Sequence, residues 1–325
     1  MLRAYGPGCN GDVLDAKITR IPDTATWVDL EEPTREEEAL VERCIKMDVP
    51  TEKEMAEIEP SSRLYEQGAA LYMTVSVLYG VQDGQPRTAP ISFVLTDNRL
   101  VTVRYATPKP VRAFADHVLR DGSLVSDAPT ALVRMLDAII DRLADELENV
   151  GADIEQISAH IFHKEMDERR IPAARLTALL TRIGRTQTLL AKIRYSAVST
   201  LRMLSFLSGS HRAHGEPGAE LRQHLVTLST DAQSLSEHAG YQSANLQFLL
   251  DASLGLISIE QYAAMKLFSW AAVVFLPPTL IAGIFGMNFH YMPELEWHYG
   301  YPISLALMLV SAIGPYLYFK RRGWI

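Results

Sequence analysis

Cysteine is scarce in this sequence, because its 325 residues include only two, Cys9 and Cys44. They form neither the paired pattern of a disulfide-stabilised scaffold nor the clustered spacing of zinc ligands. The chain is therefore not expected to depend on disulfides or on a cysteine-ligated metal, and its thiols suit a reducing cytosol.

The sequence also lacks the motifs of nucleotide hydrolysis and of nucleophilic catalysis. No segment follows the pattern G-x-x-x-x-G-K-[ST], whose backbone amides cradle phosphate groups. The order of residues suggests no Ser-His-Asp or Cys-His arrangement either. We therefore predict a protein that is not an enzyme, uses no organic cofactor and does not consume ATP.

Positive charge is outweighed by negative charge, since 31 Lys and Arg stand against 39 Asp and Glu and give a formal net charge of −8. Acidic residues gather near the N-terminus, at Glu31, Glu32, Glu36, Glu37 and Glu38. An acidic surface repels phosphate backbones, so nucleic acid is not expected as a partner. Most of this cluster is expected to be a solvated helix face.

Long apolar runs, in contrast, are present at the C-terminal end. Leu267 to Phe285 contains no charged residue, and neither does Pro302 to Phe319. A bilayer core requires about 20 apolar residues for a helix to cross it, and irregular backbone cannot face lipid. The sequence therefore predicts two transmembrane helices, at about residues 266–286 and at 302–319.

The charges that flank the two spans predict their orientation. Basic residues occupy 320–322, directly after the second span, and Lys266 precedes the first. The external loop, residues 287–301, carries Glu294 and Glu296 but no Lys or Arg. By the positive-inside rule both termini, including the basic tail at 320–325, should lie in the cytosol. The expected location is an inner (plasma) membrane of bacterial type.

The first part of the chain mixes strand and helix patterns. Strand-like runs occupy residues 70–79, 91–95 and 100–104, and the last two flank Asp97-Asn98 as the strands of a hairpin would. Residues 34–47 are typical of a helix. We predict a cytosolic α/β domain at 1–128.

After that domain the strand patterns end. Helix formers dominate residues 131–162 and 172–206, and Ser208 to Gly218 is rich in residues that break helices. Residues 129–218 are therefore predicted to be a cytosolic helical hairpin and its linker.

Beyond the linker, mostly apolar or small side chains recur at alternating steps of three and four residues. The positions are 225, 228, 232, 235, 239, 242, 246, 249, 253 and 256. This is the heptad pattern of packed helices. No proline occurs from Ala219 to Leu276, so one stalk helix is predicted to run over 219–286 and into the first span, about 100 Å at 1.5 Å per residue.

The loop between the spans contains Gly286-Met287-Asn288, followed by Met292-Pro293-Glu294-Leu295. Placed between two C-terminal spans, these motifs resemble those of the CorA magnesium transporter family. The likeness is close over roughly residues 249–325 and is still visible in 27–34 and 93–101.

This resemblance implies a fold and a function. The implied fold is a funnel-shaped homopentameric channel with an α/β cytosolic domain, a long helical stalk and two C-terminal transmembrane helices. The implied function is uptake of hydrated Mg²⁺, and also of Co²⁺ and Ni²⁺, gated by intracellular Mg²⁺. Two spans alone cannot enclose a water-filled path, which independently requires several copies around an axis.

One face of the first span, which leads back from Asn288, is the candidate pore lining. We call it the pore stripe, and its members are Gly283, Thr279, Leu276, Ala272, Phe268 and Met265. By the resemblance, Gly286, Met287 and Asn288 form the selectivity filter. Leu276, Phe268 and Met265 correspond to the family's apolar constriction. Asp251, further along the same face, corresponds to its cytosolic acidic ring and would be a metal ligand.

Without the resemblance these residues have ordinary interpretations. The apolar members of the pore stripe would be helix-packing residues, and Asp251 would be a solvated carboxylate.

The chemistry of Mg²⁺ fits an asparagine filter. Mg²⁺ loses its hydration shell reluctantly, so rapid passage favours recognition of the hydrated ion. The amide oxygen of Asn288 accepts hydrogen bonds from metal-bound water without trapping the ion, and Glu294 would concentrate cations outside. The membrane potential suffices to drive entry, because a dication gains about 4.6 kcal/mol at 100 mV.

Two alternatives remain. A zinc transporter of the same fold is disfavoured because the pore stripe holds neither Cys nor His. A membrane-anchored sensor that conducts nothing would not require Asn288.

No regulatory cation site can be predicted, since the acidic position that relatives carry on the long helix aligns with Thr227. His160 with His163, and His211 with His214, could bind a transition metal but have no further ligands, so we expect exposed polar residues.

Overall fold

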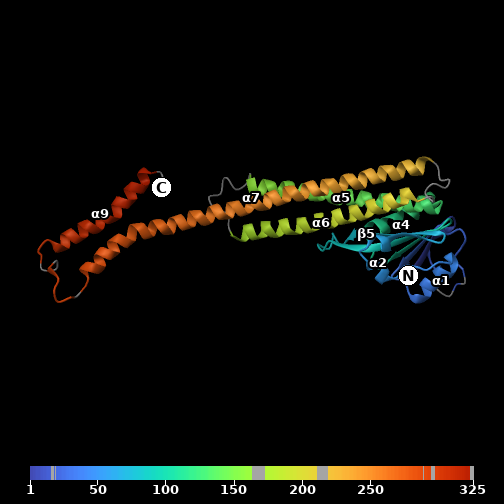
Figure 1. Cartoon of the computed structure of the whole chain (residues 1–325), viewed down its shortest axis with the longest axis horizontal. Coiled ribbons are helices and arrows are strands. Elements are labelled where there is room, and N and C mark those ends of the chain that lie inside the picture. Colours follow the sequence, from blue (N-terminus) through green and yellow to red (C-terminus); the bar gives the residue numbers. More distant parts are fainter. Residues whose placement is uncertain are drawn as a thin grey trace. The chain divides into compact units, whose positions relative to one another are not determined.

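The computed structural model describes residues 1–15, 18, 20–162, 173–210, 219–287, 289–293 and 297–322. These residues fall into two compact units, Met1–Leu250 and Asp251–Ile325. The first unit combines a β-sheet with helices. The second contains the C-terminal part of one long helix and the helix that follows it (Figure 1).

A seven-stranded sheet with the order β2-β1-β3-β7-β6-β5-β4 lies in the first unit. Its strands are β1 (Leu2–Gly6), β2 (Cys9–Val13), β3 (Trp27–Glu31), β4 (Leu64–Gln67), β5 (Ala70–Tyr79), β6 (Arg87–Leu95) and β7 (Leu100–Arg104). Strands β3 and β7 are parallel, and the other neighbouring pairs are antiparallel. The predicted hairpin at Asp97-Asn98 is confirmed, because Leu95 pairs with Leu100.

The helices are α1 (Arg35–Ile45), α2 (Glu52–Ala56), α3 (Pro60–Arg63), α4 (Lys109–Val118), the 3₁₀ helix η1 (Gly122–Val125), α5 (Ala128–Phe162), α6 (Ala173–Gly209), α7 (Ala219–Phe285) and α9 (Gly300–Arg321). Helix α7 is continuous over the predicted stalk and first span, although it contains Pro277 and Pro278. Judged by length and composition, α7 and α9 are each long and apolar enough to cross a membrane.

Thr34 caps the N-terminus of helix α1, next to the start that the sequence predicts. The Thr34 hydroxyl accepts a hydrogen bond from the Glu37 amide at 3.3 Å, and the Glu37 carboxylate accepts one from the Thr34 amide at 2.9 Å. Glu37 also pairs with the N-terminal amine of Met1 at 3.0 Å. Part of the acidic cluster therefore has specific partners, which its composition alone did not indicate.

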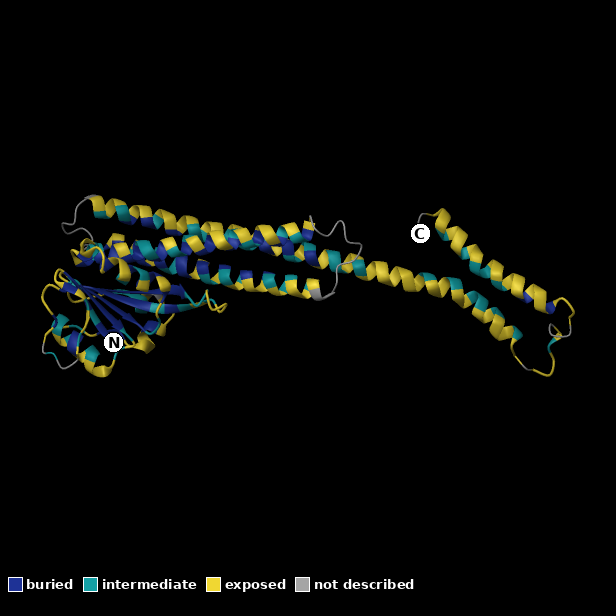
Figure 2. Ribbon diagram, turned by 180° about the vertical axis from the view of Figure 1, so that it is seen from behind, coloured by how far each residue is buried: buried dark blue, intermediate teal, exposed yellow. Residues whose placement is uncertain are grey.

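Helices cover both faces of the sheet, as the buried strands in Figure 2 show. Trp27, Met73 and Phe93 point to one face, where α4, α5, α6 and α7 pack. Their chain neighbours Val28, Tyr72 and Val94 point to the other face, where α1 and Met55 of α2 pack. Coverage of both faces explains why strand β5 is apolar at nearly every position rather than at every second one.

The predicted heptad pattern on α7 packs within the chain's own helices in the first unit. Its buried members there are Leu225, Leu228, Ala232, Ala239, Gln242, Leu246 and Leu249. Leu225, Leu228 and Ala232 belong to the same core as Leu136 of α5 and Met203 of α6. This stretch of the pattern therefore serves packing inside one subunit.

A buried ion pair connects the parallel strands β3 and β7. Asp29 is 2% exposed and Arg104 is 4% exposed, and Arg104 Nη2 lies 2.8 Å from Asp29 Oδ2. Thr102 donates to Asp29 at 2.7 Å, and Trp27 Nε1 donates to Thr102 at 3.0 Å. Arg104 also donates to Glu31 at 2.9 Å. Burial alone would raise the pKa of Glu31, but hydrogen bonds from Thr107 and Arg104 hold that pKa below its ordinary value.

We expect Asp29→Ala to destabilise the first unit strongly, because it leaves the Arg104 guanidinium buried without its main partner. Loss of one partner of a buried pair costs about 3–5 kcal/mol. At 2–4 °C per kcal/mol this lowers the melting temperature by roughly 6–20 °C. The test is a thermal melt of the full chain in detergent, with the exposed Asp12→Ala as control. Equal melting of both variants would mean that the ion pair contributes little.

Candidate ion-conduction site

The structure places every member of the pore stripe on α7, within the second unit. All of them are exposed in the single chain, including Met265 (61%), Phe268 (72%) and Leu276 (65%). Asp251, the first residue of this unit, is also exposed. Steps of three and four residues in an unbroken helix bring these side chains to one face. Within a single chain, no residue that the structure describes packs over that face.

A different face of α7 packs against α9. Trp270 of α7 contacts Phe319 of α9 with ring centroids 5.7 Å apart. The half-buried residues of α7 in this region are Trp270, Val274, Pro277, Pro278, Ile281 and Phe285. Those of α9 are Met308, Ser311, Ala312, Pro315 and Phe319, in line with the buried Ser304. At about 100° per residue, the half-buried face of α7 is centred roughly opposite the pore stripe.

The packing of α9 thus covers only one side of α7. The second span shields one side of the first and leaves the pore stripe open to further chains. Sequence spacing predicts the pore stripe but did not indicate the covered face, because both faces of the span are apolar.

The two prolines of α7 lie on the covered face, next to Leu276 of the pore stripe. Each lacks an N–H group, so the carbonyl groups of Val273 and Val274 lose their helical donors. The Thr279 hydroxyl donates to the Phe275 carbonyl at 2.6 Å. Its remaining lone pairs can therefore accept hydrogen bonds from water.

Helix α7 ends at Phe285, where the Gly-Met-Asn motif begins. The Gly286 amide donates to the Ala282 carbonyl at 2.9 Å, and a Cβ atom at Gly286 would approach that same oxygen to 3.0 Å. Glycine therefore suits this tight end of the helix. Met287 is 45% exposed. Asn288 and Glu294 to Glu296 lie outside the described residues, so the geometry of the filter stays a prediction.

The other candidate metal ligands do not converge. Among residues 1–15, 18, 20–162, 173–210, 219–287, 289–293 and 297–322, no group of three or more His, Cys, Asp or Glu side chains could hold a metal ion. His160 Nδ1 lies 2.7 Å from the Gln156 carbonyl of its own helix. His163, His211 and His214 fall outside the described residues. Thr227 is exposed and donates to the Gln223 carbonyl at 3.1 Å.

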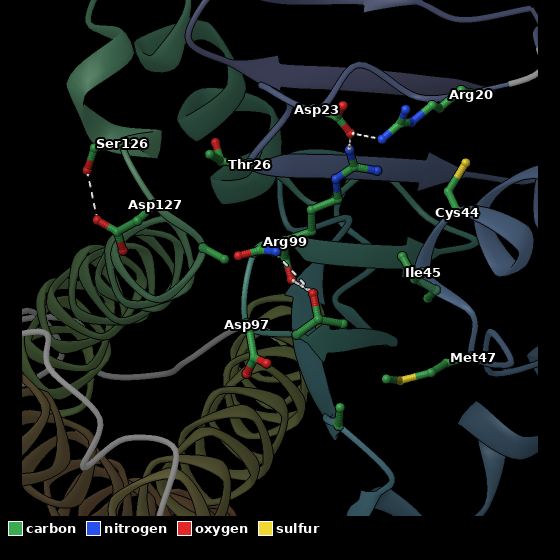
Figure 3. A pocket seen from close by; sticks show the side chains of 14 residues that line it. Arg20, Asp23, Thr26, Cys44, Ile45, Met47, Asp97, Arg99, Ser126 and Asp127 are labelled. Carbon is green, nitrogen blue, oxygen red and sulfur yellow. Dashed lines mark hydrogen bonds and ion pairs between the residues drawn. The ribbon is translucent and has the colours of Figure 1, made fainter.

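A cavity of about 670 Å³ lies in the first unit, at one end of the sheet (Figure 3). Its charged side chains have partners within the chain. Asp23 lies 2.8 Å from Arg20 and 3.5 Å from Arg99. Asp127 accepts hydrogen bonds from Ser126 at 3.0 Å and from the Thr130 amide at 2.8 Å. These groups stabilise the loops and the start of α5, and they form no nucleophile with an adjacent base.

Comparison with known proteins agrees with the motif and the fold. The family model for the CorA-like Mg²⁺ transporter protein matches residues 22–321. The magnesium transport protein CorA of Escherichia coli (strain K12) is 33% identical over 301 residues, which cover 93% of this chain and 92% of the relative.

Two solved structures share the fold. The complete structure of the CorA magnesium transporter from Methanocaldococcus jannaschii matches with a TM-score of 0.78 at 20% identity, over 100% of this chain and 98% of that one. The ZntB cytoplasmic domain from Vibrio parahaemolyticus matches at 9% identity with a TM-score of 0.54, over 74% of this chain and 91% of that one. The α/β domain, the long helix and the two apolar C-terminal helices are thus confirmed as the fold. The expectation of a transporter rather than an enzyme is confirmed by the family. The chain belongs to the CorA-like Mg²⁺ transporter family.

Proposed function

We propose that the protein is a passive channel for hydrated Mg²⁺, built from several copies of the chain around a pore lined by the pore stripe. The observation that carries this proposal is the placement of α9. It packs on the face of α7 opposite the pore stripe and leaves large apolar side chains such as Phe268 uncovered. A closed ring of copies would bury these side chains around the axis. Family resemblance favours five copies.

Each ring of the proposed pore has its own task. The filter of Gly286, Met287 and Asn288 binds the hydration shell of the ion through amide oxygens. Thr279 offers hydroxyl lone pairs, while Gly283 and Ala272 leave room for water. Rings of bulky apolar side chains form a constriction that can lose its water and close. The Asp251 ring attracts the dication at the cytosolic end.

The choice of ion follows from the donors. The pore stripe contains neither His nor Cys, the ligands that zinc prefers, which favours Mg²⁺ over the zinc alternative. Co²⁺ and Ni²⁺ also form six-coordinate hydrates and would pass as secondary substrates. The membrane potential drives entry, through an inner membrane in which both termini face the cytosol.

The experiment that tests this function is Mg²⁺ influx into liposomes that contain the purified full chain and a Mg²⁺-sensitive dye. We expect saturable influx that rises when a K⁺ diffusion potential makes the interior negative, with no ATP present. Zn²⁺ should compete more weakly than Co²⁺ or Ni²⁺. A non-conducting sensor predicts influx equal to that of protein-free liposomes.

We also propose that intracellular Mg²⁺ closes the pore by binding among the acidic cytosolic domains. Asp141 on α5 shows how these acidic side chains repel one another. Burial raises its pKa, and the carboxylates of Asp137, Asp145 and Asp231 raise it further. Repulsion between such surfaces in adjacent chains favours a splayed assembly, and divalent cations would relieve it.

Millimolar Mg²⁺ should therefore slow protease cleavage of the cytosolic domain in the detergent-solubilised assembly, relative to chelator. Protection is measured as the ratio of the cleavage rate with chelator to the cleavage rate with Mg²⁺. Asp141→Asn should reduce this ratio several-fold, because it removes one of the repelling charges. Glu148→Gln, on an exposed position of the same helix, serves as the matched control. Equal cleavage with Mg²⁺ and with chelator would contradict the gating proposal and leave the pore proposal intact.

A further inference from the structure

A small cavity of about 110 Å³ lies in the first unit, between one edge of the sheet and α6. Its polar lining consists of Arg63, Thr74, Tyr195, Ser199 and Arg202, and its apolar lining of Ile58, Leu64 and Val198. None of these side chains is a carboxylate. The cavity belongs to neither the pore stripe nor the larger cavity of Figure 3.

The cavity arises where strand β5 loses its neighbour. Strand β4 pairs only with Ala70 to Met73, so the edge of β5 beyond Met73 lacks a strand partner on this side. Helix α6 takes over this edge, and the Ser76 amide donates to Ser199 Oγ at 3.0 Å. The side chains around this contact are therefore held by the framework of the domain.

The hydrogen bonds around the cavity use Arg63 as a donor and Ser199 as an acceptor. Arg63 donates from Nε to the Glu57 carbonyl at 2.5 Å and from Nη1 to Ser76 Oγ at 3.1 Å. Ser199 Oγ accepts from the Ser76 amide, and no hydrogen bond that it donates is found among the described residues, unlike Thr200 and Ser205 of the same helix. The hydroxyl proton of Ser199 is thus available to a ligand, and Tyr195, which is 45% exposed, brings a second hydroxyl to the cavity.

The cavity is also positively charged. Among the described residues, no carboxylate lies within salt-bridge distance of Arg63 or Arg202. The nearby Ser76 hydroxyl lowers the pKa of Tyr195, and the charges of Arg63 and Arg202 act in the same direction. Both guanidinium groups therefore act on the same point, next to donor hydroxyls.

We propose that this cavity binds a phosphate group, either inorganic phosphate or the phosphate of a small ester. Two guanidinium groups offer paired N–H donors that match phosphate oxygens, and the hydroxyls of Tyr195 and Ser199 supply further donors. The volume equals about three to four waters at roughly 30 Å³ each, which suits one tetrahedral oxyanion and is too small for a nucleotide. A bound phosphate would tie α6 to the edge of β5 that β4 leaves unpaired.

The test is calorimetric titration of the full chain in detergent with inorganic phosphate, at constant chloride and without Mg²⁺. We expect one saturable site per chain. Arg202→Gln should weaken the affinity for phosphate at least tenfold, because one of the two guanidinium groups is lost. The affinity of Arg202→Lys should lie between that of the unmodified chain and that of Arg202→Gln. Arg194→Gln, exposed on the same helix and outside the cavity, is the matched control and should bind as the unmodified chain does.

A second arm separates the two sources of the phosphate group. Glycerol 3-phosphate that binds as tightly as inorganic phosphate would assign the site to phosphate esters, and weaker binding would assign it to the free ion. Absence of saturable phosphate binding, or binding by Arg202→Gln equal to that of the unmodified chain, would overturn the proposal. Variants are compared only when they elute as the unmodified assembly, and none of these outcomes depends on ion transport.

Discussion

Asn288→Ala is expected to reduce Mg²⁺ uptake to the level of protein-free liposomes while the oligomer stays assembled. The substitution removes a ring of amide oxygens that accept hydrogen bonds from the hydrated ion, and no other residue of the Gly-Met-Asn motif offers a side-chain oxygen. It leaves the pore stripe and the contact between Trp270 and Phe319 untouched. The measurement is dye-reported influx, together with the elution volume of the assembly.

Tyr291→Ala is the matched control for this variant. Tyr291 lies in the same loop and is 90% exposed, so its truncation tests whether any change in the loop impairs uptake. We expect near-normal influx from it. Normal influx by Asn288→Ala would contradict the filter assignment, whatever the behaviour of the control.

Leu276→Ser should produce the opposite effect, a large leak of Mg²⁺ under conditions that close the unmodified channel. In the proposed assembly Leu276 forms an apolar ring that closes by losing its water, and a hydroxyl ring would keep that section wet. Influx into liposomes loaded with millimolar Mg²⁺ should rise several-fold above that of the unmodified protein. A radioactive or isotopically distinct Mg²⁺ tracer reports this influx.

Ile284→Ser provides the comparison for the leak. Ile284 is 46% exposed and belongs neither to the pore stripe nor to the half-buried face that α9 covers. The same polar change should therefore leave the closed state tight. Equal tracer influx in both variants, at the level of the unmodified protein, would mean that Leu276 faces lipid or another helix.

The helical part of the fold could be predicted from the sequence because its signals are local. Two uncharged apolar runs are sufficient to predict spanning helices, and the proline-free stretch from Ala219 to Leu276 predicts a long helix. Strand β5 was predicted at its observed bounds because its run of apolar residues is bounded by turn residues. Pro277 and Pro278 did not interrupt α7, which shows that tertiary context can override a local preference against helix.

Other parts of the fold depend on contacts that are distant in sequence. Strand β2 reads Cys-Asn-Gly-Asp-Val, which carries little strand pattern, and it forms by pairing with β1. The parallel pairing of β3 with β7 joins segments about 70 residues apart, as in the pair Asp29 and Thr102. The ion pair of Asp29 with Arg104 follows from that register and could not be inferred from either residue alone.

The candidate site likewise has a part that follows from local sequence and a part that depends on distant contacts. Spacing predicts that the residues of the pore stripe share one face, because a helix repeats its faces every three or four residues. The face that α9 covers depends on how two equally apolar helices pack, so only the structure showed that it lies opposite the pore stripe. The cationic cavity beside Ser199 combines residues of α3, β5 and α6, which no local motif connects.

In the proposed channel, the pore stripe of α7 lines the path of Mg²⁺. The most direct measurement is block of Mg²⁺ influx by Cd²⁺ in single-cysteine variants, made after Cys9 and Cys44 are replaced by serine. A ring of thiolates on the path would hold a soft divalent ion and stop the flow. We predict strong block in Thr279→Cys and none in Ile284→Cys, with both variants conducting before Cd²⁺ is added. Block in Ile284→Cys without block in Thr279→Cys would contradict the assignment of the pore-lining face.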